Sequence, residues 1–134
     1  MASFPNSARI DSIQLSGMSK QVFCPIGKSW CTYYVGIELV PNRTIPDYLE
    51  IQEYFNEQAP KEATLEDFAA NIRDKLVEMC SPYTVEVVVS CNDARHMPAK
   101  VKTKYVDYRG ILLNKTMNAC AATTFNYKDD PSWR

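Results

Sequence analysis

Over residues 10–17 and again over 31–40 the apolar residues recur at every second position, the period of a β-strand. One strand is predicted from Ile10 to Gly17, where the glycine is expected to end it. A second strand is predicted over residues 31–40. Alternate residues form its apolar face: Tyr33, Val35, Ile37 and Leu39. Residues 1–9 are polar and predict no regular structure.

The middle of the chain has the helical period instead. Residues 45–58 predict one helix. A second helix is predicted to begin after Thr64, an N-cap residue with Asp67 three positions on, and to end before Pro82. Its apolar residues fall on one face over more than four turns: Leu65, Phe68, Ala69, Ile72, Leu76 and Met79.

The strand pattern then returns at Thr84–Cys91 and again after Pro98. The predicted order, β-β-α-α-β-β, implies an α+β fold with an antiparallel sheet and both helices on one face. Because such a sheet has open edges, copies of the chain are expected to close it into a ring-shaped homo-oligomer. Residues 110–134 show little pattern, as an added strand or a frayed tail would. The whole chain, 1–134, is interpreted as one domain with residues 1–9 and 110–134 as terminal extensions.

Composition narrows the classes of protein only moderately. The chain has 134 residues, a formal net charge of −1 and one histidine, His96. Bulk charge therefore demands no nucleic-acid partner, and no apolar run suggests a membrane span or a secretory signal. The five cysteines (24, 31, 80, 91 and 120) lack the spacing of a zinc site, so no metal is predicted. A cytoplasmic protein with reduced thiols is the expectation.

The candidate chemistry centres on Cys24-Pro25, at the junction of a strand and a loop. A buried cysteine is one interpretation. The other is a nucleophile for a nitrile or similar electrophile, with Lys28 in the same loop favouring the thiolate. As a single loop lysine, Lys28 could equally be only solvated.

These residues resemble the tunnelling-fold (T-fold) proteins, and within them the QueF cyano-deazaguanine reductases and the QueF-like, archaeosine-forming amidinotransferases. Those families carry a Cys-Pro nucleophile loop. The string Cys24-Pro25-Ile26-x-Lys28 is more similar to the QueF-like branch, and the resemblance runs from Cys24 to about Ser90.

The resemblance implies a role for three residues. Cys24 matches the nucleophile that adds to the nitrile carbon and gives a thioimide. Glu66, at the head of the second helix, matches the glutamate that binds the guanine-like edge of the base. Asp47 lies where the reductases begin their cofactor motif. Glu66 and Asp47 are also ordinary acids for a helix N-terminus.

The chain departs from the family pattern at two places. Leu49 and Gln52 replace both lysines of the reductase motif. Without these two positive charges the site is poorly suited to bind the phosphates of NADPH. Cys31 stands where both branches keep an aspartate as proton donor, seven residues after the nucleophile. Cys31 could be an inward strand residue, a disulfide partner for Cys24 or a weak acid. His96 could supply the proton if its loop reaches the site of a neighbouring subunit, or it could be merely an exposed loop residue.

The resemblance implies an amidinotransferase that converts the nitrile of 7-cyano-7-deazaguanine, in tRNA, to an amidine with ammonia and no cofactor. The alternatives are an NADPH-dependent reductase of the same base and a non-catalytic purine- or pterin-binding T-fold protein. The expected oligomer is a pentamer or decamer. Lys100, Lys102 and Lys104 share one face of a strand, where they could be solvated, protect the sheet edge or contact the tRNA backbone.

Overall fold

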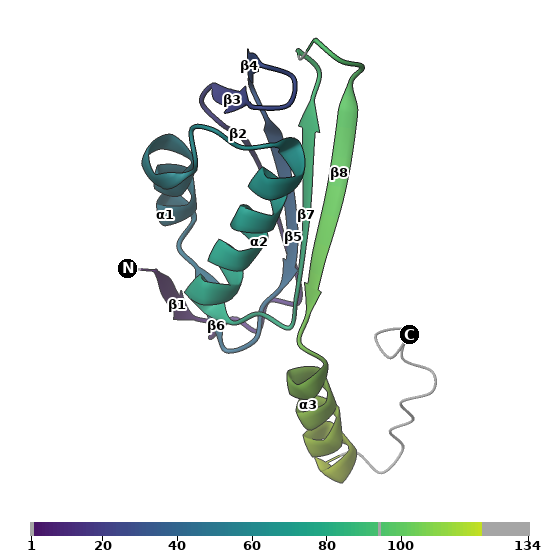
Figure 1. Cartoon of the computed structure of the whole chain (residues 1–134). Helices are drawn as coiled ribbons and strands as arrows, with labels where there is room; N and C mark the ends of the chain where they lie inside the picture. The colour runs from purple at the N-terminus through teal and green to yellow at the C-terminus, as the bar shows by residue number, and fades with distance from the viewer. Residues whose placement is uncertain (1, 94, 122–134) are drawn as a thin grey trace.

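The computed structural model describes residues 2–93 and 95–121, with side chains as far as residue 114. Its centre is a four-stranded antiparallel sheet in the order β2-β5-β7-β8. The strands are β2 (Ile13–Met18), β5 (Tyr34–Val40), β7 (Thr84–Cys91) and β8 (Ala99–Val106). Both helices of the central segment lie on one face of this sheet (Figure 1). The predicted α+β architecture is confirmed.

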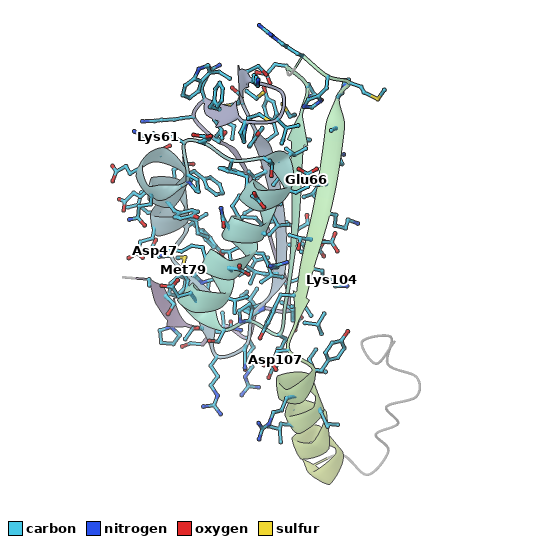
Figure 2. All side chains as sticks on the ribbon, viewed as in Figure 1. Asp47, Lys61, Glu66, Met79, Lys104 and Asp107 are labelled. Atoms are coloured by element: carbon cyan, nitrogen blue, oxygen red, sulfur yellow. The ribbon has the colours of Figure 1, made fainter. Side chains whose placement is uncertain are left out.

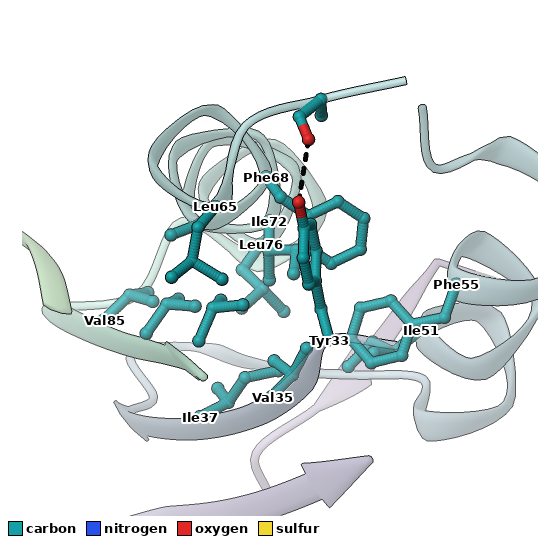
Figure 3. Packing of buried hydrophobic residues seen from close by; sticks show 14 of the residues in the cluster. Tyr33, Val35, Ile37, Ile51, Phe55, Leu65, Phe68, Ile72, Leu76 and Val85 are labelled. Carbon is teal, nitrogen blue, oxygen red and sulfur yellow. Dashed lines mark hydrogen bonds between the residues drawn. The ribbon is translucent and has the colours of Figure 1, made fainter. Parts of the chain in front are cut away.

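Helix α2 (Leu65–Cys80) forms as its sequence predicts, because its cap and its apolar face agree. The Thr64 hydroxyl accepts a hydrogen bond from the Asp67 N–H at 3.1 Å. At the other end Ser81 takes the left-handed conformation that ends the helix, and Pro82 follows it. The apolar face of α2 packs on the inward residues of β5 and β7, together with Ile51 and Phe55 (Figure 3).

The segment predicted as one helix over 45–58 divides into three elements. Strand β6 (Thr44–Pro46) comes first, then α1 (Tyr48–Glu53), and then a π-helical turn, η1 (Tyr54–Gln58). Strand β6 pairs with β1 (Ser3–Pro5), so the prediction of no regular structure in residues 1–9 was wrong.

The strand boundaries before residue 41 also differ from the prediction. Gly17 lies within β2 and pairs with Val35 instead of ending the strand. Residues 31–40 do not form one strand, because a separate hairpin precedes β5. This hairpin consists of β3 (Val22–Cys24) and β4 (Ser29–Cys31).

The C-terminal segment is helical where little pattern was predicted. Helix α3 (Tyr108–Ala121) begins beside Asp107, whose carboxylate accepts a hydrogen bond from the Gly110 N–H at 2.8 Å. The added-strand interpretation was therefore wrong as far as residue 121, and the rest of the segment lies outside the described residues. Within the described ranges, no helix is long and apolar enough to cross a bilayer.

The predicted lysine stripe lies on edge strand β8. Lys100, Lys102 and Lys104 are all exposed. The Lys102 ammonium lies 3.3 Å from a Glu86 carboxylate oxygen on the neighbouring strand. Strands β2 and β8 are the two outer strands of the four-stranded sheet.

Tyr33 carries the largest hydrogen-bonded side chain of the core. It is 1 % exposed, its ring meets Phe68 edge-on at 5.1 Å, and its hydroxyl donates to the Ala63 carbonyl at 2.9 Å (Figure 3). We expect Tyr33→Phe to lower the free energy of unfolding by about 1–3 kcal/mol, because a buried carbonyl loses its donor. Urea denaturation measures the change. The matched control is Tyr34→Phe, on the exposed face, which should change it by less than about 0.5 kcal/mol; equal losses in both variants would contradict the prediction.

Candidate functional site

The hairpin β3–β4 holds Cys24 at its inner face. Its register pairs Cys24 with Ser29, and alternation turns one set of side chains inward: Val22, Cys24, Ser29 and Cys31. Phe23 and Trp30 pack against each other on the outer face, with ring centroids 5.4 Å apart. The four residues between the strands, Pro25 to Lys28, form the turn that follows the thiol.

Backbone hydrogen bonds tie this hairpin to the segment that leads into α2. The Phe23 N–H donates to the Lys61 carbonyl at 2.8 Å, and the Ala63 N–H donates to the Phe23 carbonyl at 3.0 Å. Cys24 follows Phe23 directly, and Glu66 follows Ala63 by three residues. The fold therefore brings the candidate nucleophile and the head of the second helix to one end of the molecule (Figures 1 and 2).

The Cys24 thiol is 6 % exposed in the single chain. The Gly27 N–H donates to its sulfur at 3.4 Å. Burial raises the pKa of Tyr33 far above its usual value, and the nearby thiols of Cys24, Cys31 and Cys91 raise it further.

His96, in the turn between β7 and β8, reaches the loop that follows Cys24. A methyl group built at Gly27 would lie 3.5 Å from His96 Cδ2 and 3.8 Å from Cys24 Sγ, so the ring and the sulfur both border that position. His96 Nδ1 lies 2.7 Å from the Met97 carbonyl. The imidazole is thus brought to the nucleophile loop of its own chain.

The other predicted site residues are less closely gathered. Lys28 ends the loop in a left-handed conformation (φ 50°) and is exposed. Glu66 is exposed in the first turn of α2. Asp47 caps α1, where its carboxylate accepts the Leu49 N–H at 2.9 Å. Figure 2 shows Asp47 well apart from Glu66, so one chain does not unite these two acids.

A hollow of about 250 Å³ reaches the hairpin at Val22 and is lined there by Phe55 and Phe68. Cys24 and Glu66 are not among its lining residues. This hollow therefore does not join the two residues.

Cys31 is fully buried, which favours its interpretation as an inward strand residue. Its thiol is free, as is that of Cys24. Its sulfur lies 3.7 Å from the Ser29 hydroxyl.

Next to Cys31 lie two residues that the sequence did not single out, Cys91 and Asp93. The Cys91 thiol donates to an Asp93 carboxylate oxygen at 3.2 Å, and the Thr32 N–H donates to both carboxylate oxygens at 3.1 and 3.3 Å. Burial and the hydrogen bond with Asp93 raise the pKa of Cys91 to about 12. Burial acts to raise the pKa of Asp93, but the hydrogen bonds from Thr32 and Cys91 outweigh it and lower the pKa.

The architecture defined by this sheet and its two helices is the tunnelling fold. The chain is similar to a solved structure of archaeosine synthase QueF-like in its apo form, with a TM-score of 0.59 and 19 % identical residues. The similarity covers 72 % of this chain and 92 % of that one. No protein-family model matches the sequence, and no curated protein matches it. The fold implied by the sequence resemblance is thus confirmed.

Proposed function

We propose that the protein is an amidinotransferase of the QueF-like kind, acting in the cytoplasm on the nitrile of 7-cyano-7-deazaguanine held in tRNA. The observation that carries the proposal is the link between hairpin β3–β4 and the entry to α2. It holds the Cys24-Pro25 junction beside the helix whose first turn carries Glu66, in a fold similar to that of archaeosine synthase QueF-like.

In the first step the Cys24 thiolate attacks the nitrile carbon. A C–S bond forms, one of the two π bonds between carbon and nitrogen breaks, and the nitrogen takes a proton to give a thioimide. The Gly27 N–H directed at the sulfur is the kind of donor that stabilises the thiolate before attack, and Lys28 adds a positive charge in the same loop. His96 supplies the proton, because its ring borders the loop whereas Cys31 is enclosed.

In the second step ammonia adds to the thioimide carbon. The C–S bond breaks, the sulfur leaves as a thiolate, and the proton lost by the attacking nitrogen returns to His96. The product is an amidine. No hydride is transferred, so the reaction needs no redox cofactor.

Glu66 orients the base in this proposal. Its two carboxylate oxygens accept the paired N–H donors of a guanine-like edge, and its exposed position at the head of α2 leaves them free to do so. Asp47 is too far from this end to contact the same base within one chain. We assign it to the site of a neighbouring subunit in a pentameric or decameric ring closed through β2 and β8.

The reductase alternative is disfavoured by the surface of α1. Leu49 is 65 % exposed, and the Gln52 side chain donates to Asn56 at 3.2 Å. Neither residue supplies the positive charge that the phosphates of NADPH require.

Incubation with free 7-cyano-7-deazaguanine tests the proposal by intact-mass spectrometry. We expect a covalent adduct with the mass of the base, which ammonium then converts to free amidine without consuming NADPH. An adduct that disappears with consumption of NADPH would establish the reductase instead. Reversible binding without an adduct would leave a purine- or pterin-binding protein and would contradict the enzyme proposal. The same assay on tRNA containing the nitrile base distinguishes the two forms of substrate.

A further inference from the structure

Three ligand-type side chains meet beside the nucleophile hairpin without a role in the proposed reaction. They are Cys31 at the end of β4, Cys91 at the end of β7, and Asp93 in the turn after β7. Their two sulfurs and a carboxylate oxygen all lie within 4.8 Å of one another. Cys24 is not a member of this cluster, so its sulfur stays available for other chemistry.

The separations suit one small cation. A tetrahedral zinc ion has Zn–S bonds of about 2.3 Å and Zn–O bonds of about 2.0–2.2 Å, which sets its ligand atoms about 3.5–3.8 Å apart. The Cys91 sulfur and an Asp93 carboxylate oxygen, 3.2 Å apart, would separate by a few tenths of an ångström. The other ligand atoms, already within 4.8 Å of one another, would need only a small contraction. Cys31 is 0 % exposed and Cys91 is 1 % exposed. Strand β4 holds the first and strand β7 holds the second, so neither sulfur is free to move far.

The carboxylate is fixed in the same way. The Thr32 N–H donates to both oxygens of Asp93, and Thr32 directly follows Cys31. This contact sets the carboxylate over the sulfurs from the solvent side, since Asp93 itself is exposed. A fourth ligand would enter from that side, as water.

We propose that Cys31, Cys91 and Asp93 form a zinc-binding site. Thiolate ligands select zinc over magnesium or calcium, and the buried pair provides two of them. Binding releases the two thiol protons to solvent and gives the buried sulfurs a cation to neutralise them.

The site would have a structural consequence for the proposed enzyme. Hairpin β3–β4 is a separate two-stranded sheet and shares no strand pairing with the central sheet. A zinc ion bound by Cys31 on β4 and Cys91 on β7 would join the two sheets. It would hold the hairpin, and therefore Cys24, against the central sheet.

Metal analysis of the full chain tests the inference. The protein is produced with added zinc, kept reduced with a non-thiol reductant, and gel-filtered into metal-free buffer. We expect one zinc ion per chain by plasma mass spectrometry, and loss of that zinc in Cys91→Ala. The matched control is Cys80→Ala, which removes another buried thiol outside the cluster and should keep its zinc.

A second variant keeps the inference testable if Cys91→Ala fails to fold. Asp93→Ala changes an exposed residue, and we expect it to weaken zinc affinity at least about 10–100-fold in competition with a chromophoric chelator. Cobalt should give a thiolate-to-metal charge-transfer band in the wild type and not in Cys91→Ala.

Three results would overturn the proposal. The first is a wild-type protein that holds no more zinc than Cys91→Ala. The second is a zinc affinity that Asp93→Ala leaves unchanged. The third is a Cys31–Cys91 disulfide, detected as the loss of two hydrogens under the same reducing conditions. None of these measurements uses the nitrile base, so a failure here is separate from a failure of the proposed function.

Discussion

Alanine at position 24 is expected to abolish the covalent nitrile adduct and to reduce amidine formation on the order of 10⁴-fold or more. The reason is that no other atom can take the place of the attacking sulfur in the thioimide. Intact-mass spectrometry after incubation with the nitrile base measures the adduct. Circular dichroism should show that the fold is kept, because replacing a buried cysteine by alanine removes only a small apolar volume.

Cys80→Ala serves as the matched control for this prediction. Cys80 is also buried, its thiol donates to the Leu76 carbonyl at 3.3 Å, and burial raises its pKa to about 11. A protonated thiol enclosed at the end of α2 is a poor nucleophile. The control should form the adduct as the wild type does. An adduct that persists in Cys24→Ala, mapped by peptide analysis to another cysteine, would remove Cys24 from the mechanism.

The parts of the fold that the sequence predicted are those with strong local signals. Helix α2 combines a hydroxyl cap at Thr64 with an apolar face of more than four turns. Strand β7 is rich in valine, and β8 alternates lysine with less polar residues as far as Tyr105. In these elements local preference and burial favour the same structure. The prediction therefore needed no information on tertiary contacts.

The errors occurred where a distant contact decides the structure. Strands β1, β3 and β4 have three residues each, too few to show a period, and depend on pairing partners along the chain. Gly17 continues β2 because it pairs with Val35 on β5, and the Phe55 ring lies 3.4 Å from the position of an added Cβ. Helix α3 was missed because its sequence shows no clear helical period. Among its described side chains Ile111 is buried, whereas Leu112 and Leu113 are exposed.

The residues of the candidate site differ in the same way: some belong to a local motif, and others come together only through distant contacts. Cys24, Glu66 and Lys28 could be selected because each stands within a short local motif. Cys91 and Asp93 could not, because they lie 60 and 62 positions after Cys31 and only the arrangement of β4 against β7 unites them. The cysteine spacing gave no sign of a metal site for this reason.

The second large effect is expected from Glu66→Gln. An amide in place of the carboxylate presents one acceptor and one donor to two base N–H groups. One base N–H therefore loses its acceptor, and the other keeps a neutral acceptor in place of a charged one. At about 1–3 kcal/mol for each group, affinity for the base should fall on the order of 10²–10⁴-fold. Isothermal titration with the free nitrile base, on a Cys24→Ala background that prevents covalent capture, measures the binding step alone.

Asp67→Asn is the matched control, because Asp67 is the next residue in the same first turn of α2 and is equally exposed. Both variants remove one negative charge from the positive end of the helix dipole, so they should lose the same small amount of stability, about 0.3–1 kcal/mol. Only Glu66→Gln should lose affinity for the base. Equal binding losses in the two variants would show that the acid acts through the helix end and not through contact with the base, and the assignment of Glu66 as the base-recognising residue would then fail.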